Sequence, residues 1–117
     1  MVPAAAPPAG AYSHGVVIGE LLFTAGMGPR DASGTIVGRT VAEQTEQVLA
    51  NLEQILRVRG RTLADVVKAT VHLSELANFA EFDAAYRRIM PEPYPVRTTV
   101  GSVLSNILVE IDFVARA

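Results

Sequence analysis

Apolar and polar residues alternate most regularly between residues 66 and 73. The apolar residues fall on one face of this segment and the polar residues on the other: Val67, Ala69, Val71 and Leu73 against Lys68, Thr70 and His72. A period of two is the pattern of a half-buried β-strand, so the segment is predicted to be a strand with one face on the core. His72 has no metal-ligating residue at a ligand spacing, and it is predicted to be an ordinary polar-face residue.

Two segments show the period of amphipathic helices. The first begins at Thr40, which forms a capping-box pattern with Glu43, and Gly60 follows as a stop signal. Its apolar stripe consists of Val41, Val48, Leu49, Leu52, Ile55 and Leu56. The second helix is predicted to begin at Asn78, with Glu81 completing its cap, and to run until a proline ends it. Its inner face is predicted to carry Phe79, Phe82, Tyr86 and Ile89.

Shorter apolar segments predict the remaining strands. These strands are residues 16–18, 21–24, 35–37, 97–103 and 107–115. The first two form a hairpin around Gly19 and Glu20, and the third follows the turn residues 31–34. The element order is then β-β-β-α-β-α-β-β, which predicts an α+β fold with two helices on one face of a single sheet.

The last predicted strand carries apolar side chains on both faces. One face is suited to packing against the helices and consists of Ile107, Val109, Ile111, Phe113 and Ala115. Leu108 and Val114 point to the opposite face, alongside Glu110 and Asp112. Because the helices cover only one face, a neighbouring subunit is expected to cover the other.

Composition and charge indicate one small domain. The chain has 117 residues, and a single domain at 11–117 is predicted after a flexible arm at 1–10 rich in Ala and Pro. The formal net charge is −2, and the basic cluster of Arg57, Arg59 and Arg61 lies at a helix end, where cations suit the helix dipole. No nucleic-acid partner is therefore expected. The sequence has no cysteine and no histidine at a metal-ligand spacing, so no disulfide and no metal site is expected. It also has no apolar run of membrane-spanning length. A cytosolic protein without membrane contact is therefore expected.

Two charged residues stand out as candidate functional groups. Arg97 begins a strand of mostly small or apolar residues, and its planar guanidinium suits bidentate binding of a carboxylate. Glu110 interrupts a nearly apolar strand, where a carboxyl group is suited to proton transfer. The same pattern also fits a structural ion pair or two solvent-facing side chains, and spacing alone favours that structural interpretation.

Several segments share a family pattern when they are taken together and in order. They are Gly-Ala-Tyr-Ser-His at 10–14, Leu-Phe-Thr-Ala-Gly at 22–26, Glu-Gln-Thr at 43–45, Asn-Leu at 51–52, Ile-Leu at 55–56, Val-Val-Lys-Ala-Thr-Val at 66–71, residues 79–86, Pro-Val-Arg at 95–97 and Val-Glu-Ile-Asp at 109–112. The set covers nearly the whole chain with compatible spacing. On these segments the chain resembles the Rid (YjgF/L-PSP) family of reactive intermediate deaminases.

The resemblance implies a chorismate-mutase-like protomer that assembles as a homotrimer, with active sites between subunits. It further implies hydrolysis of 2-aminoacrylate and related enamines and imines to 2-keto acids and ammonia, without cofactor or metal. By the family motifs, Arg97 binds the substrate carboxylate, Glu110 positions the attacking water and Tyr12 borders the pocket. The region of Gly26 would supply backbone groups close to the ligand, because the absence of a side chain permits close approach.

The chain departs from the usual family residues at four positions near the expected pocket. Ala25 and Met27 replace a Ser and a Gln, Thr99 stands where Cys is common, and Asp83 stands where Asn is common. Asp83 would repel a substrate carboxylate unless it pairs with Arg97. Two other functions stay open: a trimeric carboxylate-binding protein that uses Arg97 without turnover, and an endoribonuclease, against which the acidic net charge counts.

Overall fold

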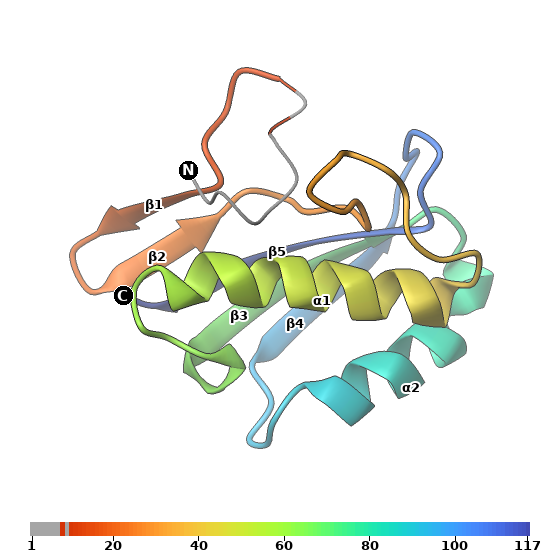
Figure 1. Ribbon diagram of the computed structural model, residues 1–117. Coiled ribbons are helices and arrows are strands. Elements are labelled where there is room, and N and C mark those ends of the chain that lie inside the picture. The colour runs from red at the N-terminus through yellow and green to blue at the C-terminus, as the bar shows by residue number, and fades with distance from the viewer. Residues whose placement is uncertain (1–7, 9) are drawn as a thin grey trace.

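In the computed structural model, which describes residue 8 and residues 10–117, five strands form one mixed sheet and two α-helices lie on the same side of it (Figure 1). The elements are β1 (Gly15–Ile18), β2 (Leu21–Thr24), α1 (Val41–Arg57), β3 (Val66–Leu73), α2 (Phe79–Ile89), β4 (Val96–Gly101) and β5 (Val109–Arg116). The strand order is β1-β2-β5-β3-β4, with β3 and β4 parallel and the other neighbours antiparallel. The predicted α+β class is confirmed. Most of the arm predicted at 1–10 lies outside the described residues.

Helix α1 forms as its sequence predicts. The Thr40 hydroxyl accepts a hydrogen bond from the Glu43 N–H, and the Glu43 carboxylate accepts one from the Thr40 N–H, both at 3.1 Å. This capping box satisfies N–H groups that have no partner within the helix. The apolar stripe of α1 packs on the sheet and on α2, and it buries Val41, Val48, Leu49, Leu52, Ile55 and Leu56.

The cap predicted for the second helix is wrong. A short 3₁₀ turn leads directly into α2, and the Asn78 side chain makes no capping hydrogen bond. Glu81, which was expected to complete that cap, instead accepts a hydrogen bond from the Ala42 N–H of α1 at 3.0 Å. Its carboxylate therefore stabilises the first turn of the neighbouring helix and ties the two helices together at that end.

The strand predicted at residues 35–37 is also wrong, so the described chain has five strands where the sequence predicts six. One isolated bridge forms there, to Arg30. The Asp31 carboxylate accepts hydrogen bonds from the N–H groups of Ser33 and Thr35, both at 3.0 Å. This side chain closes a local turn that folds the segment back on itself instead of adding it to the sheet.

Strand β3 lies between β5 and β4 and forms the floor of the core. Ala69, Val71 and Leu73 are fully buried under the helices, as the alternation predicts. Val67, which the alternation places on the same face, is 36% exposed, because the register with β5 shifts at that residue. An extra residue of this kind breaks the period of two at the start of the strand.

The face of the sheet opposite the helices is apolar at its sides and polar in the middle. Exposed apolar side chains from β1 and β2 lie on one side: Val16, Ile18, Leu21 and Phe23. Strand β4 adds Val96, which is 69% exposed, and Glu110 and Asp112 of β5 lie between the two sides. Both described α-helices lie on the other face (Figure 1), so this apolar area is uncovered in a single chain.

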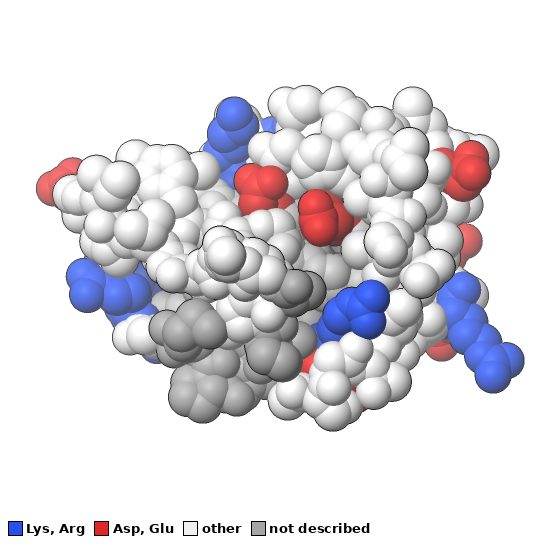
Figure 2. Space-filling model, turned by 90° about the horizontal axis from the view of Figure 1, so that it is seen from above, with Lys and Arg blue, Asp and Glu red and all other residues white. Residues whose placement is uncertain are grey.

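Charged side chains are dispersed over the surface. On the face seen in Figure 2, the Lys and Arg side chains form a few separate groups. Two of the three arginines near the end of α1 have partners within the chain, since Arg57 lies 3.3 Å from Glu53 and Arg61 donates to the backbone oxygen of Ala117 at 2.6 Å. No helix in the described part of the chain is long and apolar enough to cross a membrane.

Candidate functional site

Arg97 lies on β4 and points toward α2. Its register partner Ala69 is fully buried, so Arg97 lies on the helix-covered face of the sheet. The guanidinium carbon lies 5.5, 5.3 and 4.7 Å from the ring centroids of Phe79, Phe82 and Tyr86. Cation–π contacts with these rings hold the guanidinium in place.

The Arg97 guanidinium also forms an ion pair with Asp83. Nη1 donates to Oδ1 of Asp83 at 2.9 Å, and Asp83 Oδ2 accepts a second hydrogen bond from Arg87 at 3.2 Å. Burial alone would raise the pKa of Asp83, but the hydrogen bonds from the two arginines outweigh it and lower that pKa. Of the two possibilities that the sequence left open for Asp83, pairing with Arg97 is the one observed.

A hollow of about 340 Å³ opens beside this ion pair. It is lined by Asp83, Tyr86, Arg87, Tyr94, Pro95 and Arg97. The Tyr86 hydroxyl is buried and has no hydrogen-bond partner among the described residues, and burial raises the pKa of Tyr86 to about 12. Tyr86 is therefore neutral at ordinary pH. A fixed guanidinium beside uncharged aromatic walls suits a small carboxylic acid with an apolar remainder.

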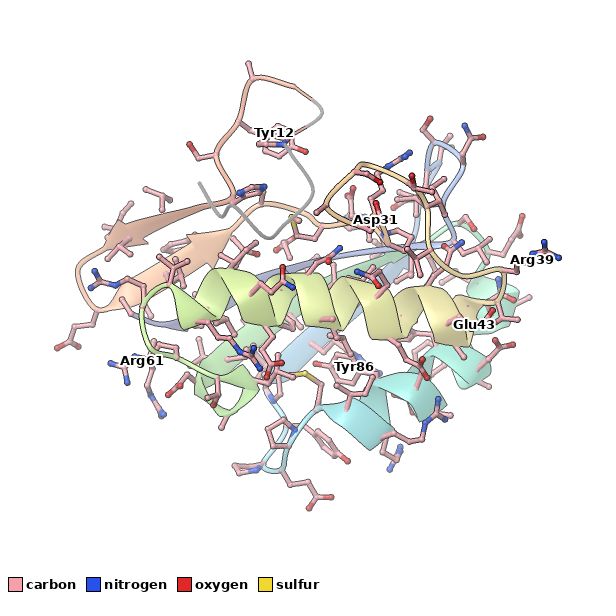
Figure 3. All side chains as sticks on the ribbon, viewed as in Figure 1. Tyr12, Asp31, Arg39, Glu43, Arg61 and Tyr86 are labelled. Carbon is pink, nitrogen blue, oxygen red and sulfur yellow. The ribbon has the colours of Figure 1, made fainter. Side chains whose placement is uncertain are left out.

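Glu110 lies at a second hollow, of about 370 Å³. Tyr12 and Gly26 line this hollow with it. A Cβ atom on residue 26 would lie 3.1 Å from the Glu110 carboxyl carbon. Because glycine has no Cβ, the carboxylate can occupy this space. Figure 3 shows Tyr12 well apart from Tyr86, which lines the hollow beside Arg97.

The two candidate residues do not meet within one chain. In the register of the sheet, Arg97 is the partner of Ala69 and Glu110 is the partner of His72. Ala69 and His72 are three residues apart on β3, and successive side chains of a strand point to opposite faces. Arg97 and Glu110 therefore lie on opposite faces of the sheet.

The other predicted pocket residues differ in whether they line one of the two hollows. The Ala25 N–H donates to a backbone carbonyl at 2.8 Å, which leaves its amide committed within the fold. Met27 is a core residue, 5% exposed, that also borders the Glu110 hollow. Thr99 is half-buried two residues beyond Arg97 on the same face, and it lines neither of the two hollows.

Sequence reasoning missed the walls of the hollow beside Arg97. The period of α2 assigns Phe79, Phe82 and Tyr86 to the core. Their three rings also flank the Arg97 guanidinium. Tyr94 was not singled out. Its place directly before the Pro-Val-Arg segment is the signal that could have found it, because a residue next to a binding strand can wall its site.

A further polar cluster lies on the open face of the sheet. His72 Nδ1 lies 2.7 Å from the Ser102 hydroxyl oxygen. Burial raises the pKa of Asp112, although the charges of His72 and Lys68 oppose that rise. Within the described residues, no three His, Asp or Glu side chains gather closely enough to hold a metal ion. His72 thus has a hydroxyl partner on the polar face.

Comparison with known proteins identifies the family. The family model described as Endoribonuclease L-PSP matches residues 3–117. The chain belongs to the Rid (YjgF/L-PSP) family. Among Rid-family relatives, a RutC family protein of Pyrococcus horikoshii is 37% identical over 111 residues, which span 92% of this chain and 88% of that protein. Reactive Intermediate Deaminase A, chloroplastic, of Arabidopsis thaliana is 37% identical over 109 residues, which span 91% of this chain and 58% of that protein.

Solved structures of the Rid family share the fold. RidA from an Antarctic Psychrobacter species has a TM-score of 0.94 at 28% identity, over 100% of this chain and 97% of that one. E. coli TdcF, solved with bound serine, has a TM-score of 0.92 at 27% identity, over 100% of this chain and 96% of that one. The family resemblance found in the sequence segments is confirmed.

Proposed function

We propose that this chain hydrolyses reactive imines and enamines of the 2-aminoacrylate type to 2-keto acids and ammonia. The observation that carries the proposal is the Arg97 guanidinium, which is held by aromatic rings beside a hollow of about 340 Å³. A guanidinium held in this way can bind a carboxylate through parallel hydrogen bonds. In a 2-imino acid the carboxylate is attached directly to the reactive carbon, so binding one group positions the other.

The reaction needs two copies of the chain, because Arg97 and Glu110 lie on opposite faces of the sheet. A second copy of the chain that covers the open face would bring its own Glu110 to the edge of the sheet that β4 forms. Exposed apolar side chains on that face, including Val16 and Phe23, supply area for such a contact. We therefore assign Arg97 and Glu110 of the partner subunit to one site, repeated around a homotrimer.

In this site the imine carbon is attacked by water. Arg97 fixes the carboxylate, and Glu110 of the partner subunit accepts a proton as the water oxygen bonds to the imine carbon. Glu110 passes that proton to the nitrogen, and the remaining hydroxyl proton moves to the nitrogen as the C–N bond breaks. The products are a 2-keto acid and ammonia. An enamine enters the same sequence after one protonation at its terminal carbon, and no step requires a cofactor or metal.

The names of two relatives support a small carboxylic acid as the ligand. One relative is named Reactive Intermediate Deaminase A, and E. coli TdcF was solved with serine, which carries a carboxylate. The proposed partner is accordingly a small imino or keto acid, and neither nucleic acid nor membrane has a part in the reaction.

The direct test generates the imine beside the purified protein. A threonine dehydratase releases the imine, and its decay and the appearance of 2-oxobutanoate are followed with and without this protein. Arg97→Ala should abolish the acceleration, and Glu110→Gln should reduce it by about a hundredfold. Arg57→Ala is the matched control, because it removes one arginine from an exposed pair with Glu53 and should leave the rate unchanged.

Two results would replace the proposal with another function. Tight binding of 2-oxobutanoate without any acceleration would identify a carboxylate-binding protein. Cleavage of RNA that survives Arg97→Ala, together with an unaccelerated imine decay, would identify a nuclease that works through other residues.

A further inference from the structure

Asp83 already takes part of the hydrogen-bonding capacity of the Arg97 guanidinium. Among the described residues it is the only hydrogen-bond partner of the Arg97 side chain, through Nη1 at 2.9 Å. A guanidinium carries five N–H donors, so donors remain for one further carboxylate. The two side chains are 20% and 24% exposed, so their pairing is only partly screened by water.

The charges that line the hollow nearly cancel. Arg97 and Arg87 are opposed by Asp83, and Tyr86 and Tyr94 bring no charge, which leaves a single net positive charge on the lining. The side chain of Arg87 is 67% exposed, so water screens most of its attraction for a ligand. The partly buried charges of Arg97 and Asp83 therefore balance each other, and the net positive charge of the lining is that of the exposed Arg87.

We infer, on the basis of the proposed function, that Asp83 restricts the site to substrates with one carboxylate. The first carboxylate of a ligand takes the free donors of Arg97 and neutralises the remaining positive charge. A second carboxylate in a hollow of about 340 Å³ would lie close to Asp83 with no unpaired buried cation to receive it. Like charges a few ångströms apart repel strongly when they are partly buried. The substrate class is then 2-imino acids that carry no second carboxylate.

The test compares one monocarboxylate with one dicarboxylate. Dissociation constants of 2-oxobutanoate and 2-oxoglutarate are measured by calorimetry for the wild type, Asp83→Asn and Asp83→Glu. In the wild type 2-oxobutanoate should bind more tightly. Asp83→Asn should tighten 2-oxoglutarate binding at least about tenfold more than it tightens 2-oxobutanoate binding. Asp83→Glu keeps the charge and should keep the discrimination.

A matched control separates the local effect from the change in total charge. Glu53→Gln also removes one carboxylate from an arginine pair, on α1 and away from this hollow, and it should leave both constants unchanged. Equal tightening of both ligands in Asp83→Asn would overturn the inference, because Asp83 would then compete with every carboxylate alike. An unchanged ratio of the two constants would overturn it as well.

Arg97→Ala distinguishes this inference from the proposed function. One outcome is that keto-acid binding requires Arg97 while the ratio of the two dissociation constants is the same in the wild type and Asp83→Asn. In that case the inference fails and the proposed carboxylate site stands. If binding is unaffected by Arg97→Ala, the proposed function fails first, and the inference about Asp83 falls with it. The thermal unfolding of each variant is recorded, and Asp83→Glu supplies a folded comparison if Asp83→Asn unfolds.

Discussion

The backbone of Gly26 lies directly against the carboxyl group of Glu110. A Cβ atom on residue 26 would stand 3.1 Å from both the carboxyl carbon and Oε2 of Glu110. Favourable contacts between such atoms lie at about 3.5–4.0 Å. The next residue, Met27, exchanges backbone hydrogen bonds with Ile111 at 2.8 and 3.1 Å, so the backbone beside Gly26 is fixed to β5. The glutamate side chain is therefore the part that would have to move.

Replacing this glycine should displace the carboxylate without unfolding the protein. Gly26→Ala is expected to lower kcat/KM for imine hydrolysis by about tenfold or more, because small displacements of a catalytic group are costly. The thermal midpoint should change little. Gly28→Ala is the comparison, since its Cβ would meet only the flexible end of Ile107 at 3.1 Å, and its loss should be smaller. Full activity in Gly26→Ala would show that Glu110 does not depend on this contact.

The elements with a complete local signal could be predicted from the sequence. The period of β3 and the capping box of α1 both depend on residues close together in the chain. The capping box is confirmed, and so is the period from Lys68 onward. The errors arose where a side chain serves a distant or competing partner. Glu81 caps α1 instead of its own helix, and Asp31 closes a turn where a strand was expected.

The candidate site was only partly accessible from the sequence. Arg97 and Glu110 could be singled out because each is a charge within an apolar strand. Their placement on opposite faces depends on the registers of β4 and β5 with β3, which no local pattern specifies. The aromatic contacts of Arg97 were missed for a similar reason, since the period of α2 predicts burial and does not say against which atoms.

The Asp83 ion pair should make stability depend on acid pH. Burial opposes ionisation of Asp83, but hydrogen bonds from Arg97 and Arg87 lower its folded-state pKa below the usual 3.8. The stabilisation is therefore present above that usual value and is lost as the pH falls through the lowered one. Between about pH 5 and about pH 2, the free energy of unfolding should fall more steeply in the wild type than in Asp83→Asn.

Urea unfolding of the two proteins at a series of pH values measures this difference. Every other carboxyl group is common to both proteins, so its contribution cancels in the comparison. Parallel curves over the acid range would contradict the assignment of the lowered pKa to the pair with Arg97.

A charge on the open face of the sheet should prevent assembly. Phe23 is 39% exposed among apolar neighbours on that face, and Phe23→Asp would place a carboxylate in the proposed subunit contact. Sedimentation should show a trimer for the wild type and a monomer for Phe23→Asp. Val58→Asp is the control, because Val58 is 64% exposed at the end of α1 and lies away from that face. A Phe23→Asp protein that still sediments as a trimer would place the contact elsewhere.

The central claim is that one active site takes Arg97 from one copy of the chain and Glu110 from another. The chain offers a complementation test, because Arg97→Ala and Glu110→Gln each inactivate a different half of the site. The two variants are produced together with different tags, and assemblies that carry both tags are isolated. In any mixed trimer, one of the three contacts joins an intact Arg97 to an intact Glu110.

The deciding measurement is the imine-hydrolysis rate of these mixed trimers. The account predicts about one third of the wild-type rate per trimer, while each variant alone stays nearly inactive. Mixed trimers that are no more active than the single variants would contradict a site shared between subunits.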